Sequence, residues 1–372
     1  MKRQAMNKSE RILSLDIFRG LTVILMILVN NPGSWLAIYA PFQHAHWHGC
    51  TPTDLVFPFF LFIVGVSISF SMAKVKGDPL KRPIAMRKAL WRGAKLIGIG
   101  LFLGLFPLFN FSEMRIPGVL QRIGVVFMIT SALYLYADRK TIIATFVSIL
   151  VVYWLAMVFV PIPEIGTPNI DDPNAVLSAY IDQLFFKGHM WSGTKTWDPE
   201  GLFSTFPAIG TAILGLFSGE IVKQNKGNEV VKKLFLLGVV SVVIGQVWSI
   251  IFPINKSLWT SSYVLYTGGL GAIALGLSFY LFDVKKLGRN QVLLPKAFGL
   301  NPMAAYVLAQ MIASLIGVIS IGDTTIKAHL FAMITIDSIP LEASSLLFAV
   351  LYVAFISIPI LILYRKNIVI KV

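Results

Sequence analysis

The strongest constraint on this chain is a series of apolar segments of about 20 residues with few or no charges. A helix of that length crosses a hydrocarbon core of about 30 Å and satisfies its own backbone hydrogen bonds there. Ten such segments can be marked: 17–39, 55–73, 93–112, 117–136, 141–161, 203–222, 234–253, 262–282, 297–320 and 343–364. We therefore expect an all-α, polytopic integral membrane protein with about ten transmembrane helices.

The basic residues predict how these helices are oriented. Only 13% of the residues are charged, yet the net charge is +14. With ten spans and a cytoplasmic N-terminus, six of the 32 Lys and Arg residues fall on the far side: Arg115, Arg122, Lys187, Lys195, Lys256 and Lys327. Cytoplasmic loops carry this excess of positive charge. We expect both termini in the cytoplasm, anionic membrane lipid as the partner of the basic loops, and no nucleic-acid partner.

We expect one transmembrane domain over residues 1–372, with two longer far-side segments at about 162–203 and 320–342. The first segment is acidic and aromatic and ends in TKTWDPEGLFSTFP. Aromatic faces beside carboxylates commonly grip sugars or cationic groups, which favours an ordered lid carrying Trp197, Asp198 and Glu200. The alternative is an interfacial loop with the usual belt of tryptophans.

The stretch FQHAHWHGCTPTDL, residues 42–55, holds three of the five histidines and the only cysteine. Histidines at i, i+2 and i+4 share one face of an extended segment, which is one way to bind zinc. No Glu lies in the stretch, and a polar interfacial loop is the simpler reading, so we expect no metal. Asp54 can cap the following helix and also orient a histidine of this loop, as in general bases.

Polar residues also interrupt the apolar segments. Asn30 and Asn31, followed by Pro-Gly, break the first span before its far end, which is tolerated where backbone lines a cavity. Arg115 and Arg122 flank the entry of the fourth span, and an intramembrane Arg indicates a site.

On the cytoplasmic side, Asp16 and Arg19 are spaced for a local ion pair. Alternatively, Arg19 and the basic segment LKRPIAMRKALWRGAK receive a phosphorylated ligand.

Five blocks of the sequence, in order, are SLDIFRGLTVILMILVNN, HAHWHGCTPTDLVFPFFLFIVG, MRIPGVLQRIG, WDPEGLFST and NKSLWTSSYV. Together they resemble the heparan-α-glucosaminide N-acetyltransferase family of transmembrane acyltransferases. The resemblance implies transfer of acetyl from cytoplasmic acetyl-CoA to the amino group of a glucosamine-type sugar at the periplasmic side. It further implies a bacterial-type member without the lumenal domain, in the cytoplasmic (inner) membrane.

The family's H-A-x-W-x-G motif begins at His44, which the resemblance implies is the general base or a transient acetyl carrier. It implies Asp54 as the residue that orients His44, and Asn30 as the amide that holds the acetyl carbonyl or the oxyanion. His46 and His48 fall on variable positions of the motif, which removes them from a zinc site. Cys50 is a competing nucleophile, since a thiol can also carry acetyl.

We assign the remaining candidates to the two substrates. The CoA donor is assigned to Arg19, Arg115 and Arg122. The amino-sugar acceptor is assigned to Trp47, Trp197, Asp198 and Glu200. The physiological acceptor and the oligomeric state stay open, with a homodimer among the alternatives.

Two rival functions remain on the sequence alone. Ten spans, a broken first helix and intramembrane polar residues also fit a secondary transporter of a sugar or amino sugar. O-acetylation of an envelope polysaccharide would use the same site and a different acceptor. The titratable residues cluster at one interface and no internal repeat is seen, which favours the enzyme.

Overall fold

The structure is a computed structural model of the chain and describes residues 12–288, 292–336 and 338–370. Within these residues the fold is almost entirely helical, which confirms the all-α prediction. The strands of the described part are one short antiparallel pair, β1 (Ser320–Ile321) and β2 (Thr324–Thr325).

Ten long helices account for the ten apolar segments, and each segment overlaps one of them. They are α1 (Leu13–Val29), α2 (Val56–Ser71), α4 (Arg82–Leu105), α5 (Val119–Tyr136), α6 (Arg139–Phe159), α8 (Thr205–Gln224), α9 (Asn228–Trp248), α10 (Ser261–Phe279), α12 (Pro302–Val318) and α14 (Leu341–Arg365). The shorter helices are α3 (Ala73–Lys76), α7 (Leu177–Phe186), α11 (Leu293–Leu300) and α13 (Ile326–Ile334). Single turns are η1 (Ala40–Phe42), η2 (Pro52–Leu55), η3 (Phe111–Glu113) and η4 (Tyr280–Val284).

Seven helices of the described part are long and apolar enough to cross a membrane, or up to eight if the bent pair α11–α12 is one span. That pair turns by 89° at its break. Of the other long helices, α1 has 17 residues and α4 begins with a basic half. The chain is therefore a multi-pass membrane protein, while the count of ten spans and the cytoplasmic termini stay predictions.

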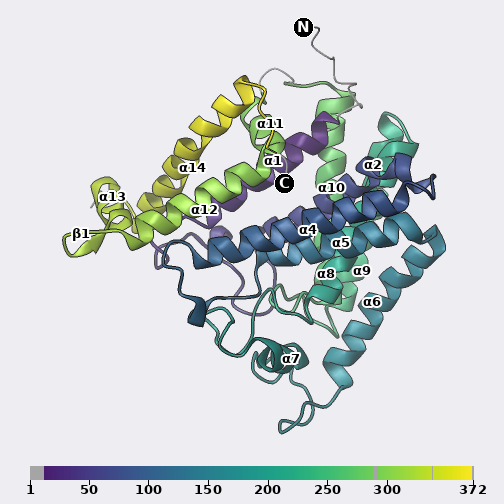
Figure 1. The fold of residues 1–372 in the computed structure, drawn as a ribbon, viewed down its shortest axis with the longest axis horizontal. Helices are drawn as coiled ribbons and strands as arrows, with labels where there is room; N and C mark the ends of the chain where they lie inside the picture. Colours follow the sequence, from purple (N-terminus) through teal and green to yellow (C-terminus); the bar gives the residue numbers. More distant parts are fainter. Residues whose placement is uncertain (1–11, 289–291, 337, 371–372) are drawn as a thin grey trace.

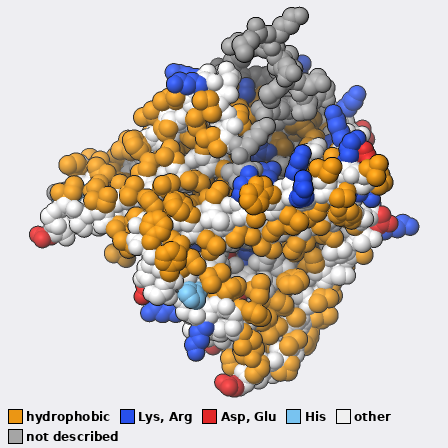
Figure 2. Space-filling model, viewed as in Figure 1, with side chains coloured by type: hydrophobic (Ala, Val, Ile, Leu, Met, Phe, Trp, Pro, Cys, Tyr) orange, Lys and Arg blue, Asp and Glu red, His pale blue; other side chains and the backbone are white. Residues whose placement is uncertain are grey.

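The arrangement separates a basic end from the end that carries the long loops. In Figure 1, α7 lies at the bottom and α13 with β1 at the left, away from α2 at the upper right. Figure 2 shows Lys and Arg side chains gathered toward the upper right, near the start of α4, while hydrophobic side chains cover α12 and α14. Exposed large apolar residues continue along α9 and α14, as expected for helices that face lipid.

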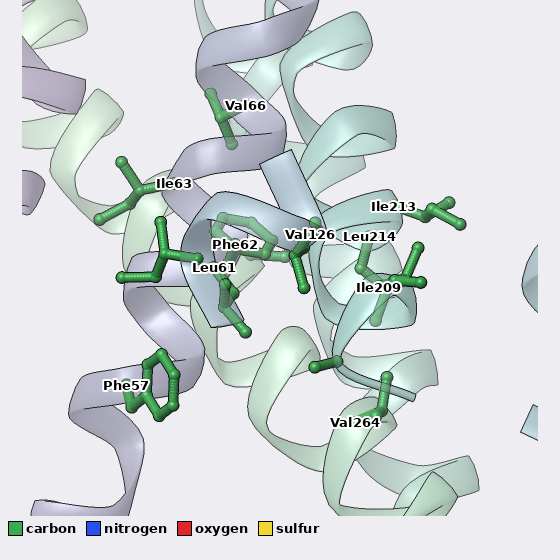
Figure 3. Packing of buried hydrophobic residues seen from close by; sticks show 14 of the residues in the cluster. Phe57, Leu61, Phe62, Ile63, Val66, Val126, Ile209, Ile213, Leu214 and Val264 are labelled. Atoms are coloured by element: carbon green, nitrogen blue, oxygen red, sulfur yellow. The ribbon is translucent and has the colours of Figure 1, made fainter. Parts of the chain in front are cut away.

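The central core forms where α2 crosses α8. Figure 3 shows Leu61 and Phe62 of α2 beside Ile209, Ile213 and Leu214 of α8. Two glycines permit this close crossing: a Cβ atom on Gly65 would lie 1.8 Å from the backbone oxygen of Ala212, and one on Gly215 would lie 1.9 Å from that of Phe62. Small residues let helix backbones approach in this way in membrane proteins. The start of α2 is thereby fixed relative to the start of α8.

Candidate active site

The carboxylate of Asp54 organises the loop that leads into α2. Asp54 lies on η2 and forms a capping box with Thr51. Its Oδ2 accepts three hydrogen bonds of 3.0 Å, from the backbone N–H of Ala45, the backbone N–H of Thr51 and the Thr51 hydroxyl. Asp54 is only 1% exposed. Its position is therefore fixed by donors from both ends of the loop.

The second oxygen of this carboxylate holds His44. Nδ1 of His44 lies 2.6 Å from Oδ1 of Asp54. An ionised carboxylate only accepts hydrogen bonds, so Nδ1 carries a proton, and in the neutral imidazole Nε2 is then the nitrogen with the lone pair. The His44 side chain is 48% exposed, so a substrate can reach the imidazole ring. The pair has the geometry of an oriented general base.

Lys256 is a third member of this cluster, and the sequence reasoning assigned it no role. It comes from the loop between α9 and α10, within the block NKSLWTSSYV. Its Nζ lies 3.4 Å from Oδ1 of Asp54, and 3.0 and 3.3 Å from Nδ1 and Nε2 of His44. Because Nζ of Lys256 is almost equally far from both ring nitrogens, it does not lie along the lone-pair direction of either nitrogen. Burial lowers the pKa of Lys256.

The Lys256 loop is held against the histidine loop by its backbone. The N–H of Gly49 donates to the carbonyl of Ile254 at 2.7 Å, and Gly49 has a φ of +107°, which glycine adopts readily. The neighbouring Asn255 is fully buried, with Nδ2 3.3 Å from Nδ1 of His48. Lys256 is thus delivered to His44 by a fixed contact between two loops.

The three histidines of the motif do not converge on one point. Nε2 of His48 lies 2.9 Å from Oδ1 of Asp171, whereas His44 is bonded to Asp54. Across residues 12–288, 292–336 and 338–370, no three His, Cys, Asp or Glu side chains are grouped to hold a metal ion.

The long loop 162–203 packs directly on the histidine motif. The indole Nε1 of Trp47 donates to the carbonyl of Ile170 at 2.9 Å. The ring of Trp47 also meets that of Trp197 edge to face, with centroids 5.2 Å apart. The structure therefore brings together two residues assigned to the acceptor, one from the motif and one from the loop, as an aromatic pair.

The carboxylates of this loop are engaged by Arg115. Nε and Nη2 of Arg115 donate to the two oxygens of Asp198 at 2.9 and 2.5 Å, and Nη2 also contacts the Glu200 carboxylate. The Asp198 side chain is fully buried, and it accepts the backbone N–H of Trp191 as well. Arg115, Asp198 and Glu200 thus form one ion-pair network, bidentate at Asp198, that holds the 162–203 loop against the segment before α5. Their assignment to donor and acceptor stays a prediction.

Replacing Arg115 with leucine is expected to loosen the loop, because it leaves the buried Asp198 charge without its cation. Breaking a buried pair on one side costs about 3 kcal/mol. We expect a lower thermal unfolding midpoint in detergent and faster protease cleavage within residues 162–203. Lys187→Leu, at a basic residue within the 162–203 loop itself, is the matched control, and cleavage at the same rate in both variants would contradict the role of Arg115.

Arg122 is buried within α5, with 2% exposure. Its Nη2 donates to the carbonyl of Gly201 at 3.1 Å and contacts the Ser204 hydroxyl, while the guanidinium lies 5.1 Å from the ring centre of Trp259. Among the described residues, Nε and Nη1 have no hydrogen-bond partner. Arg122 therefore joins α5 to the start of α8, and two of its guanidinium nitrogens have no partner among the described residues, which is compatible with the predicted binding of anionic CoA.

Arg19 lies on α1 and joins three helices. Its Nη1 donates to Asp16 at 3.0 Å and to the carbonyl of Gly299 on α11 at 3.1 Å, and its Nη2 donates to Ser67 on α2 at 3.1 Å. The local ion pair with Asp16 is therefore present. Binding of a CoA phosphate by Arg19 stays a prediction.

The structure places Asn30 at the end of α1, on the wall of a cavity of about 220 Å³. The polar residues of this wall also include Asn31, Gln310, Ser314 and Lys327, from α12 and α13 as well as α1. His44 and Asp54 do not line this cavity. The structure thus joins His44 to Asp54 but gives Asn30 a separate setting, and its role with the acetyl group stays a prediction.

Cys50 is part-buried beside the cluster, and burial, with the nearby Asp54 charge second, raises the pKa of its thiol to about 12. At neutral pH it is therefore a thiol, and the thiolate is the nucleophile. We expect Cys50→Ser to leave turnover of acetyl-CoA unchanged, measured as release of free CoA. A large loss of turnover together with an acetylated Cys50 in the parent protein would reverse this assignment.

Comparison with known proteins adds a family to this geometry. Residues 11–254 match the family described as heparan-alpha-glucosaminide N-acetyltransferase, catalytic. The chain is 31% identical over 336 residues to heparan-alpha-glucosaminide N-acetyltransferase of Mus musculus, with 76% of this chain and 51% of the mouse protein covered. For the Homo sapiens protein of the same name the identity is 31% over 334 residues, with 74% and 50% covered. The chain spans about half the length of these relatives.

Proposed function

The chain belongs to the heparan-alpha-glucosaminide N-acetyltransferase family, and from this membership we propose that it is a transmembrane acetyltransferase. The donor is cytoplasmic acetyl-CoA, and the acceptor is the amino group of a glucosamine-type sugar on the periplasmic side of a bacterial inner membrane. His44 is the general base or a transient acetyl carrier. The family relatives carry the acetyltransferase name, which supports the reaction class.

One observation carries the catalytic part of this proposal: Nδ1 of His44 is held at 2.6 Å by a buried carboxylate, while its side chain stays half exposed. Acetyl transfer to an amine needs a group that takes a proton from the attacking nitrogen. Nε2 of His44 has the lone pair for this step, and Asp54 stabilises the imidazolium that forms.

Acetyl transfer to the sugar amine removes two protons from its nitrogen. The sugar ammonium loses one proton to water, and the neutral amine attacks the thioester carbon of acetyl-CoA. As the C–N bond forms, the carbonyl oxygen takes up negative charge and the second nitrogen proton passes to Nε2 of His44. The C–S bond then breaks, and the CoA thiolate takes that proton from His44. In the carrier variant, Nε2 attacks the thioester carbon and the CoA thiolate leaves as the C–S bond breaks. The neutral amine then attacks the acetyl carbon, the bond from that carbon to Nε2 breaks, and the freed Nε2 takes the proton that the nitrogen loses and passes it to the CoA thiolate.

The position of the cluster supports an acceptor on the far side. The cluster of His44, Asp54 and Lys256 lies in the loops that precede α2 and α10. The 162–203 loop precedes α8 and packs on Trp47, so it lies at the same end of the helix bundle. With a cytoplasmic N-terminus, this is the periplasmic end. The basic segments around α4 and the α8–α9 connection then face the cytoplasm, where the CoA phosphates are.

The test is an assay of purified protein with acetyl-CoA and glucosamine. We expect release of free CoA only when the amine is present, with formation of N-acetylglucosamine. Saturable sugar flux in proteoliposomes without CoA would instead make the chain a carrier, and acetyl recovered on a hydroxyl would make it an O-acetyltransferase. Either result would replace the proposed activity.

A further inference from the structure

The cluster around His44 contains one carboxylate and two groups that can balance its charge. Asp54 is 1% exposed, His44 Nδ1 lies 2.6 Å from its Oδ1, and Lys256 Nζ lies 3.4 Å from the same oxygen. The Lys256 side chain is itself only 19% exposed. A buried carboxylate needs a positive partner, and Lys256 supplies one before any proton reaches His44.

We propose that Lys256 is a positioning residue that acts through His44. Its ammonium is the resting counter-ion of Asp54, and it thereby keeps the His44 imidazole free to accept a proton and to release it again. The kinetic consequence rests on the proposed function of His44 as base. The effect of Lys256 on the protonation of His44 depends only on the contacts among Lys256, His44 and Asp54.

The physical reason is the short distance between the two basic groups. A proton on His44 would create a second positive charge 3.0 Å from Lys256, and like charges at that distance disfavour each other. Asp54 then balances only one of them. Besides Asp54 and His44, the Glu200 carboxylate acts electrostatically on Lys256, whereas Cys50, a neutral thiol at neutral pH, adds no charge there. Without Lys256, the protonated imidazole of His44 becomes the counter-ion of Asp54, and Asp54 stabilises this protonated form.

The first test needs no substrate. Diethylpyrocarbonate modifies unprotonated imidazole, so its rate at His44, measured by peptide mass spectrometry, reports how often His44 is free of the extra proton. In Lys256→Met, which keeps the length of the side chain, we expect His44 to react about tenfold more slowly than in the parent at about pH 6, with the difference lost at alkaline pH.

The controls address folding and general effects. Lys187→Met removes a far-side lysine outside the cluster and should leave the His44 rate unchanged, and His329 on α13, whose hydrogen-bond partners are Thr324 and Thr325, provides an internal reference in every variant. Lys256→Arg keeps the charge and should retain most of the parent rate, which a loss of packing would not restore. If Lys256→Met fails to fold, Lys256→Gln is used in the same comparison. Equal His44 rates in the parent and the uncharged variant at about pH 6 would overturn the proposal.

The second test is kinetic and separates this inference from the proposed function. We expect Lys256→Met to lower kcat about tenfold or more while KM for acetyl-CoA changes little, with activity recovering as pH rises. A parent protein that releases no CoA with glucosamine refutes the proposed function, and the modification rates still decide the role of Lys256. A parent that is active while Lys256→Met keeps the parent kcat and pH profile refutes the role of Lys256 alone.

Discussion

His44→Ala is expected to lower acetyl transfer to glucosamine by about 10² to 10⁴-fold, the usual contribution of a positioned general base. The substitution removes the half-exposed imidazole that Asp54 orients, and His48, the other histidine of this loop with a carboxylate partner, contacts Asp171 instead. The measurement is amine-dependent release of CoA by purified protein. Folding should be retained, because the side chain is half exposed and the anchoring hydrogen bonds to Asp54 Oδ2 remain.

His46→Ala is the matched control, since His46 is exposed and lies two residues away in the same loop. We expect its turnover to equal that of the parent. Mass spectrometry of the parent after exposure to acetyl-CoA alone separates the two roles of His44: an added acetyl group on this residue indicates the carrier, and its absence with full turnover indicates the base. Parent-like activity in His44→Ala would remove the residue from the mechanism.

Asp54→Asn is expected to have an effect of similar size and to lower turnover by about 10² to 10⁴-fold. The reason is that it moves the proton of the neutral His44 ring from Nδ1 to Nε2. Oδ2 of Asp54 accepts three donors, from Ala45 and Thr51. In the variant the amide oxygen must take that place, so the NH₂ group faces Nδ1 of His44. Nδ1 then accepts, Nε2 carries the proton, and the group that should act as base is blocked.

A second carboxylate–histidine pair in the same region serves as the comparison. Asp171→Asn changes the partner of His48, which lies 2.9 Å away, and this carboxylate is 74% exposed. We expect turnover to stay at the parent level there. Comparable losses at Asp54 and Asp171 would show that the effect comes from the stability of the loop and not from the orientation of His44.

The sequence predicts the helices of this protein well because a bilayer leaves few other choices. Each of the ten apolar segments overlaps one long helix, but their ends differ where a local interaction decides. The first apolar segment, 17–39, is predicted to break at Asn30 and Asn31 before Pro32 and Gly33, and α1 indeed ends at Val29, at that break. The sharp corner between α11 and α12 was not predicted, because Asn301 before Pro302 indicates a helix boundary but not an angle.

The site was predictable only in its local part. His44 and Asp54 are ten residues apart on one short loop, and a capping aspartate can reach back over that distance. Lys256 is 212 residues from His44 in the chain, and its approach depends on how two loops pair through Gly49 and Ile254. Likewise, Arg115 and Asp198 were singled out for different ligands, and only the folded chain shows that they bind each other. Residue spacing within one segment predicts contacts such as that between His44 and Asp54, whereas spacing does not show which distant loops pair with each other.

The close crossing of α2 and α8 has a consequence for how the enzyme works. Asp54 lies at the start of α2, the loop carrying Glu200 leads into α8, and Gly65 and Gly215 leave no gap between the two helices. The proposed base, His44 with Asp54, and the C-terminal end of the 162–203 loop therefore belong to one rigid body. The entropy of bringing His44 and Asp54 into line is lost during folding, so in the proposed mechanism substrate binding has only to align the two substrates with a preformed histidine–carboxylate pair.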